Sequence, residues 1–535
     1  MSYKTRKEVL PRSEIEALIA DGHHIVIYNG KVLKLDNWLD RHPGGDMAIF
    51  HVVGRDATDE INAYHSDEAL ATMGAYQIGI TGEKIWENFL PPIQGGVFRK
   101  RGSIAADEGI SLSSSASSSS QEAVTQKPAP IFTNEQILKA ERLKLIEEDE
   151  NRQLQHDLEI FPSLDYNTQT EIGTKYKALY KRVEDAGLFE PNYRGYFSDF
   201  LRISTMFSLS WYLFDKSMFL SAICLGMGWH QLVFIAHDAG HIGITHGYQM
   251  DNWIGMTIAA WIGGLSLGWW KRNHNVHHII TNDPVHDPDI QHLPVFAVSN
   301  RFFSSVKSTY YNCVLKYDIF ARYLIPLQHM TYYPILCLGR FNLYALSWGH
   351  VLLGRGPRHG KAAWFRWYEL MGLSFFAYWF FYLIVYKSIP TAGQRWMYVI
   401  VSHVATMPVH VQITLSHFAM STQDLGLSES FAQRQLRTTM DVDCPAWLDF
   451  LHGGLQFQAI HHLFPRMPRH NLRRAQRYVL EYCKDIGVEY HIYGFVHGNQ
   501  HVIGKLGEIA KQAEIFRDCE RHLREEHVAE MTEAK

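Results

Sequence analysis

The sequence has 535 residues and a formal net charge of −4 at pH 7, so two or more folding units are expected and nothing in the overall charge indicates nucleic-acid binding. Its 30 histidines and 13% aromatic residues indicate metal sites and contact with a membrane interface. The six cysteines are scattered without a CxxC pair, which argues against a disulfide framework or a cysteine zinc site and indicates a reducing compartment.

Residues 1–95 are predicted to form a small soluble domain. The N-terminal segment MSYKTRKEVLPRSE contains no apolar stretch, so no cleaved signal peptide is expected. The segment HHIVIYNGKVLKL at 23–35 predicts two strands around an Asn29-Gly30 turn. Residues 96–132 contain SLSSSASSSS and KPAP and predict a flexible linker, because they offer few apolar side chains to bury.

A second domain is predicted over residues 133–535. It begins with a charged segment, 133–156, that predicts a solvated helix. The apolar run from Phe200 to Ala236 is interrupted by Asp215-Lys216 and predicts a helical hairpin. Residues 366–386 and 396–416 predict a second pair of helices around a short loop, which gives about four transmembrane helices in total.

Two further apolar stretches, 251–270 and 323–349, are ambiguous between crossing the membrane and lying in its interface. The second contains Arg340 near its middle, which favours an interfacial position. The first lies between two histidine clusters, at 237–241 and 274–278, which must lie on the same side of the membrane to form one site. A single crossing there would place them on opposite sides, so an interfacial or re-entrant segment is expected.

The N-terminal domain carries a recognisable histidine pattern. His42-Pro43-Gly44-Gly45 is followed by Gly54-Arg55-Asp56-Ala57-Thr58 and by His65-Ser66. Residues 8–82 resemble the cytochrome b5 family on these motifs. The resemblance implies an α+β domain in which His42 and His65 are the two axial ligands of heme b, leaving no open iron position for oxygen. His51, which lies between them, is expected to be a solvated helix residue.

Three further histidine clusters lie beside the apolar segments. They are His237-Asp238-Ala239-Gly240-His241, His274-Asn275-Val276-His277-His278 and Gln458-Ala459-Ile460-His461-His462. Spacings of i, i+3 and i+4 place the members of each cluster on one helix face. Seven imidazoles exceed the four ligands of one zinc ion and suit two metals of higher coordination, while residue type alone leaves zinc, copper, iron and nickel open.

The order HDxxH, HxxHH and QxxHH after a cytochrome b5 domain resembles the front-end desaturases of the membrane fatty acid desaturase superfamily. The resemblance covers about residues 160–495 and includes GGLSLGWWKRNHNVHH and HHLFPRMPRHNL. It implies an all-α integral-membrane desaturase domain with two non-heme iron ions and O2 as co-substrate. The implied catalytic residues are His237, His241, His274, His277, His278, Gln458, His461 and His462. His417, in QITLSHF, matches an extra family histidine and is expected to be an eighth histidine ligand.

Several neighbouring residues are less determined by the sequence. Three roles remain open for Gln458: it ligates a metal through its carbonyl oxygen, hydrogen-bonds to a ligand, or binds a metal-linked water. His403 and His410 lie deeper in a predicted span and are expected to be pocket-lining or hydrogen-bonded. Asp238 is expected to orient a neighbouring imidazole, whereas Asp283, Asp287 and Asp289 are as readily explained as solvated loop residues. His286, His292 and His329 are not expected in the site.

More Lys and Arg lie on the predicted metal-bearing side than in the loop at 387–395, so the heme domain and the clusters are expected to face the cytosol. The family implies a multi-pass protein of the endoplasmic reticulum membrane. Because no Rossmann or flavin motif is present, it also implies NADH-cytochrome b5 reductase as the external electron source. The linker would allow the heme domain to dock at high effective concentration.

The strings FIAHDAGHIGITH, NHNVHHIITNDPVHDPDIQHLP and RFNLYALSW resemble the fungal sphingolipid Δ8 desaturases. This resemblance implies a ceramide or sphingolipid substrate and a Δ8 double bond, expected to be trans. A front-end Δ5 or Δ6 acyl desaturase and a lipid hydroxylase remain open, since they share the same motifs or the same first chemical step. A tethered electron carrier fails to explain the clusters, and a zinc hydrolase lacks a Glu base within them.

Overall fold

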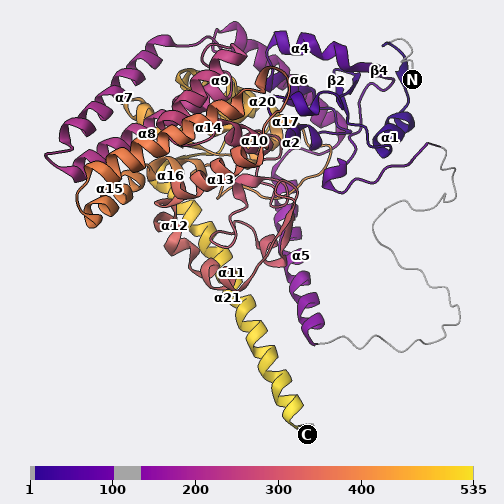
Figure 1. Cartoon of the computed structure of the whole chain (residues 1–535). Coiled ribbons are helices and arrows are strands. Elements are labelled where there is room, and N and C mark those ends of the chain that lie inside the picture. Colours follow the sequence, from indigo (N-terminus) through magenta and orange to yellow (C-terminus); the bar gives the residue numbers. More distant parts are fainter. Residues whose placement is uncertain (1–5, 102–133, 534–535) are drawn as a thin grey trace.

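The computed structural model describes residues 6–101 and 134–533. Over these residues the protein combines a small α+β domain at the N-terminus with a mostly helical domain (Figure 1). The predicted fold class is therefore confirmed. Of the linker predicted at 96–132, all but residues 96–101 lies outside the described part of the chain.

The N-terminal domain is built on a four-stranded sheet with strand order β1-β4-β3-β2. The strands are β1 (Val9–Leu10), β2 (Ile25–Tyr28), β3 (Lys31–Lys34) and β4 (Gln77–Thr81). β2 and β3 form the predicted hairpin, in which Asn29 and Gly30 both have positive φ, 48° and 69°. Helices α1 (Arg12–Ala20), α2 (Asp46–Phe50), α3 (Thr58–Tyr64) and α4 (Asp67–Met73) complete the domain.

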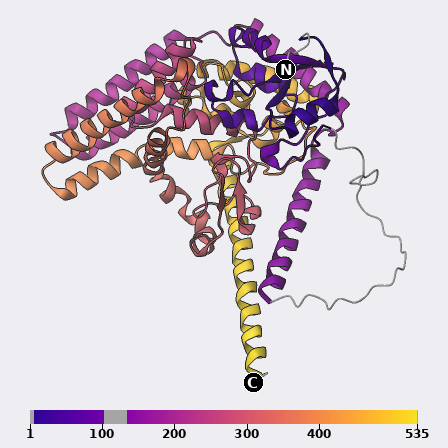
Figure 2. The same cartoon turned by 45° about the vertical axis from the view of Figure 1, so that its right-hand side comes forward.

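A hairpin of two long helices opens the apolar part of the second domain. α7 (Tyr193–Leu213) and α8 (Met218–Gly240) are joined by residues 214–217, so the turn falls at the predicted Asp215-Lys216. α7 exposes large apolar side chains, with Phe197 62% and Trp211 83% exposed. In Figures 1 and 2, α7 and α8 lie beside α14 and α15 in an elongated bundle on the side of the molecule away from the sheet.

The second predicted pair of helices is also present. α14 (Phe365–Phe376) continues as a π-helical segment to Ser388, and α15 (Ala392–Val404) is followed by α16 (Met407–Leu415). Within residues 6–101 and 134–533, three segments are long and apolar enough to cross a membrane: Met218–Gly240, Gly360–Ser388 and Ala392–Leu415. α7, the fourth helix of the prediction, is not among these three.

The two ambiguous stretches are divided into short helices. α9 (Tyr248–Met256) continues as a π-helical turn to Ile262, and the chain then turns at Gly263 and Gly264 before α10 (Leu267–Ile279). The later stretch forms α11 (Ile319–Leu324), α12 (Gln328–Leu336) and α13 (Gly339–Leu353). Each of these helices is shorter than the ~20 residues that a crossing needs. Neither stretch contributes to the three described segments that are long and apolar enough to cross a membrane, and the interfacial or re-entrant placement of 251–270 stays a prediction.

The remaining helices of the second domain lie outside the apolar bundle. The buried apolar side chains of α6 (Tyr166–Asp185), α17 (Phe431–Thr438), α19 (Gln458–Leu463) and α20 (Leu472–Ile486) share one core. α18 (Asp449–His452) precedes α19, and two small sheets pair β5 (Val306–Ser308) with β6 (Cys313–Leu315) and β7 (Asp441–Asp443) with β8 (Ile492–Gly494). α5 (Asn134–Ile160), predicted from 133–156, and α21 (Phe495–Glu533) project from the body in the same direction (Figures 1 and 2).

Candidate heme and metal centres

The two predicted heme ligands face each other across a narrow space. His42 follows the turn Leu39–Arg41, and His65 directly follows α3. Their ring centroids lie 6.1 Å apart with an interplanar angle of 30°. Each Nδ1 bonds to a backbone carbonyl, His42 to Gly45 at 2.6 Å and His65 to Ile61 at 2.9 Å, which fixes the proton at Nδ1 and leaves each Nε2 free to ligate.

This spacing fits a heme iron with two axial imidazoles. Nitrogens bound at about 2 Å on opposite sides of one metal ion place the ring centroids roughly 6 Å apart. Desolvation of the His65 ring, helped by the neighbouring His42, lowers its pKa to about 4, so it is neutral and able to ligate at pH 7. The geometry of this pair therefore suits heme.

The three histidine clusters of the second domain meet in one buried region. One ligand nitrogen from each of His237, His241, His274 and His461 lies within 4.8 Å of the others. A second group with the same limit contains His277, His417 and His462. His278 lies between the two groups, since its ring centroid is 5.1 Å from that of His241 and 4.0 Å from that of His462.

Five buried nitrogens of these rings have no hydrogen-bond partner among the described residues. They are His241 Nε2, His278 Nδ1, His417 Nδ1, His461 Nε2 and His462 Nε2. Burial lowers the pKa values of His278, His461 and His462 well below the usual range, so these rings are neutral. Buried polar atoms are normally satisfied, and several neutral imidazoles aimed at shared points suit divalent metals. The donor set therefore fits two metal ions.

Asp287 and Gln435 orient two of the rings, and the sequence did not identify either one. Asp287 is fully buried and its Oδ2 accepts from His277 Nδ1 at 2.8 Å, so the solvated interpretation of Asp287 is wrong. Gln435 Oε1 accepts from His462 Nδ1 at 2.8 Å, and its Nε2 donates to the carbonyl of His278 at 2.8 Å. The ten-residue spacing from His277 to Asp287 carried no periodic signal, and Gln435 lies on a separate helix.

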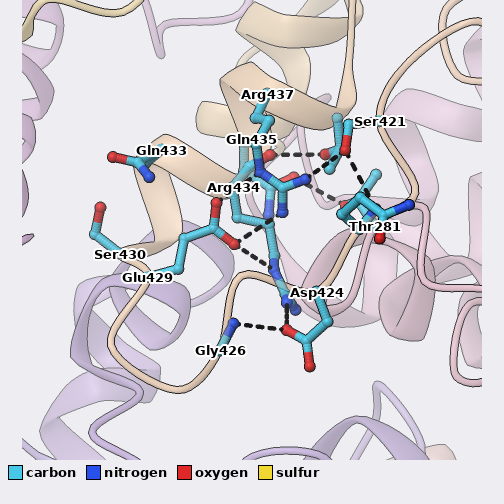
Figure 3. A network of polar contacts seen from close by, with 12 residues as sticks. Thr281, Ser421, Asp424, Gly426, Glu429, Ser430, Gln433, Arg434, Gln435 and Arg437 are labelled. Carbon is cyan, nitrogen blue, oxygen red and sulfur yellow. Dashed lines mark hydrogen bonds and ion pairs between the residues drawn. The ribbon is translucent and has the colours of Figure 1, made fainter. Parts of the chain in front are cut away.

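A buried ionic network holds the helix that carries Gln435 (Figure 3). Glu429 accepts from Arg437 Nε at 2.8 Å and from Arg437 Nη2 at 2.9 Å. Arg437 Nη1 also lies 3.3 Å from Asp157 Oδ2 and donates to Ser421 at 2.8 Å. Because Arg437 is two residues after Gln435 on α17, this network anchors the segment that contacts the third histidine cluster.

Other residues of the prediction lie around the centre in different ways. Gln458 lines a small cleft with His237 and His461, and its buried Oε1 has no partner among the described residues. Asp238 accepts from Tyr196 at 2.7 Å and pairs with Arg469, while its carboxylate is 3.9 Å from His237 Nδ1.

The two histidines of the deeper span are outside both groups. His403 is hydrogen-bonded, as expected, to the carbonyl of Val399 and to Tyr344, whereas His410 Nε2 is buried without a partner in the described chain.

The interpretation of His51 as a solvated residue is wrong. Its side chain is fully buried, and its ring packs at 5.5 Å against His286 of the second domain. Gln94 donates to His51 Nδ1 at 3.2 Å, and Thr309 lies 3.5 Å from its Nε2. His51 directly follows α2 of the first domain, and it is contacted by Gln94 of that domain and by Thr309 and His286 of the second one.

Comparisons with known proteins agree with this geometry. The cytochrome b5-like heme/steroid binding domain family matches residues 11–82, and the fatty acid desaturase family matches residues 217–494. The chain belongs to the fatty acid desaturase family. It is an oxidoreductase of that family with a fused cytochrome b5 domain, and three apolar helices of its described residues are long enough to span a membrane.

Two relatives named as sphingolipid desaturases cover nearly the whole chain. A Delta 8-(E)-sphingolipid desaturase of Kluyveromyces lactis is 55% identical over 97% of this chain and 95% of its own length. The Delta 8-(E)-sphingolipid desaturase of Candida albicans is 52% identical over 98% of this chain and 99% of its own. The Acyl-lipid (9-3)-desaturase of Borago officinalis is 35% identical over 65% of this chain and 77% of its own.

Proposed function

We propose that this protein introduces a trans Δ8 double bond into the long-chain base of a ceramide or related sphingolipid, with O2 as co-substrate. The observation that carries the proposal is the set of unpartnered imidazole nitrogens in two groups beside a heme-spaced histidine pair. Support for the substrate comes from relatives at 51–55% identity that are named Delta 8-(E)-sphingolipid desaturases. The relative named for acyl lipids is more distant, at 35% identity.

In this proposal the chain divides into a heme domain at 1–95, a linker at 96–132 and a membrane desaturase domain at 133–535. His42 and His65 hold heme b. His237, His241, His274 and His461 hold one iron, His277, His417 and His462 hold the other, and His278 lies between them. Gln458 borders the first group. When bound, the two irons supply the O2 chemistry that removes hydrogen from an unactivated methylene, which side-chain acids and bases do not perform.

The chain's own polar groups hold the ligands in their working form. Asp287 accepts from His277 Nδ1, and Gln435 accepts from His462 Nδ1, so the proton stays on Nδ1 and Nε2 would be available as the metal ligand. The ring of Trp270 packs on His237, His241 and His274 with centroid distances of 5.2, 5.2 and 4.4 Å. This indole covers one side of the site.

The electron balance requires an outside donor. Each double bond removes two hydrogens from the substrate, and two further electrons with two protons complete the reduction of O2 to two waters. We propose that NADH-cytochrome b5 reductase supplies these electrons to the heme domain. The protein would reside in the endoplasmic reticulum membrane, with the heme domain and the histidine clusters on the cytosolic face.

Lipid analysis of cells that lack their own Δ8 desaturase tests this function. Cells expressing the wild-type protein should accumulate long-chain bases two mass units lighter, with the double bond at C8, while His462→Ala cells should not. His497→Ala is the matched control, because this histidine is exposed on α21 outside the two groups. New double bonds in fatty acids instead would identify an acyl desaturase, and products sixteen units heavier would identify a hydroxylase.

A further inference from the structure

The segments that carry the two axial histidines rest directly on the desaturase domain. Asn275, between His274 and His277 on α10, donates to the carbonyl of Gly44 at 3.0 Å. Arg466, just after α19, donates to the carbonyl of His65 at 2.8 Å. The second and third histidine clusters are thus each tied by one hydrogen bond to a heme-ligand segment.

The two glycines after His42 allow this close approach. A Cβ on Gly44 would lie 2.8 Å from Asn275 Nδ2, and a Cβ on Gly45 would lie 3.1 Å from Arg272 Cγ. Gly45 also has a positive φ of 88°, which favours glycine. An ion pair of 3.0 Å between Arg272 and Asp46 closes the same contact. The glycines therefore serve the docking of α10 as well as the turn that presents His42.

Tyr64 joins the two centres more directly than any of these bonds. It is the residue before His65, and its ring lies edge-on to the ring of His278, with the centroids 5.7 Å apart. The same ring packs against the core that contains Ala63 and the buried side chains of α19. Its hydroxyl oxygen is buried without a hydrogen-bond partner in the described chain, so the packing of the aromatic ring, and no polar bond, holds it in place.

We propose that Tyr64 is the positioning residue for electron transfer between the two centres, with its ring filling the gap between the His65 backbone and His278. This inference rests on the proposed function. In each transfer one electron leaves a ferrous heme, which becomes ferric, and reduces one non-heme iron from ferric to ferrous. No atom or proton moves, and the transfer occurs twice for each double bond. The heme domain then transfers electrons from the docked position that the structure shows.

The test follows heme reoxidation and domain docking separately. The full-length protein with heme and iron is reduced by a chemical reductant without oxygen and then mixed with O2 and ceramide, and the heme absorbance is recorded. Docking is measured by amide hydrogen exchange over α3 and α10. The variants are Tyr64→Leu and Tyr64→Phe. Asn88→Ala is the matched control, because Asn88 contacts the Leu427 carbonyl at the same interface away from the histidines.

Tyr64→Leu should slow heme reoxidation by about tenfold or more, while heme content, heme potential and exchange protection stay at wild-type values. Tyr64→Phe and Asn88→Ala should stay within about twofold of wild type. If Tyr64→Leu loses heme, Tyr64→Met, which also lacks the ring, provides the same comparison.

Three results would overturn the proposal. They are a wild-type rate for the variant without the ring, a slowed rate that accompanies lost protection, and equal slowing in Tyr64→Phe. Failure of the wild-type protein to reoxidise its heme at all would count against the proposed function itself.

Discussion

The buried ionic network around Glu429 offers a quantitative test of how the third histidine cluster is held. Glu429 and Arg437 are 4% and 1% exposed, and both carboxylate oxygens of Glu429 bond to the guanidinium of Arg437. Arg434 Nε lies 3.3 Å from the same carboxylate. Glu429→Gln keeps the shape of the side chain and removes its charge, which leaves the buried guanidinium of Arg437 with Asp157 as its remaining carboxylate partner and the partly buried one of Arg434 with Asp424.

Removing one partner of a buried, hydrogen-bonded ion pair costs about 3–5 kcal/mol. Because the Gln amide oxygen still accepts one hydrogen bond, the lower end of this range, about 3 kcal/mol, is expected here. The loss frees α17, so Gln435 no longer fixes the proton of His462. Iron content per chain should therefore fall together with stability.

The assay is denaturant unfolding of the purified protein in lipid nanodiscs, with iron content measured on the same samples. Lys181→Gln is the matched control, because Lys181 forms only exposed ion pairs with Glu184 and Asp185, and it should leave both readings unchanged. A Glu429→Gln protein as stable as wild type and fully loaded with iron would refute the reasoning.

Three other outcomes are expected. Asp287→Asn should weaken iron binding by about 10–100-fold, measured as iron retained against a chelator, and unchanged retention would contradict the role given to its bond with His277. Burial, with His286 and Arg55 nearby, lowers the pKa of His51 to about 3, so the folded state favours the neutral ring. The free energy of unfolding is therefore unaffected by this group above pH 6.5 and falls by about 1.4 kcal/mol per pH unit below it. The protection factor for hydrogen exchange over α2, which is corrected for the intrinsic pH dependence of exchange, should therefore fall from pH 6.5 to pH 5 in wild type and stay flat in His51→Gln. Gly226→Ala places a Cβ 2.2 Å from the Ser402 carbonyl and should destabilise the α8–α15 contact by about 1–3 kcal/mol, whereas Gly393→Ala, in open space on α15, should not.

The local features of this protein could be predicted from the sequence alone. Turn residues such as Asn29-Gly30, the charged break at Asp215-Lys216 and the i, i+3, i+4 histidines depend on contacts between near neighbours in the chain, so their patterns are legible without a fold. The positions of the heme-ligand pair and of seven clustered histidines followed from these patterns and from the family resemblance. His417 followed from the resemblance, and the structure places it with His277 and His462.

Only the tertiary structure decided which side chains support those ligands. Asp287 contacts His277 across a loop, Gln435 contacts His462 from a separate helix, and Tyr64 contacts His278 from the other domain. No sequence periodicity links such partners. Burial of His51 likewise depends on the docking of one domain on the other. Long-range contacts of this kind arise from packing the whole chain, which is why the sequence predicted the ligand histidines and only the structure showed how their rings are oriented and connected.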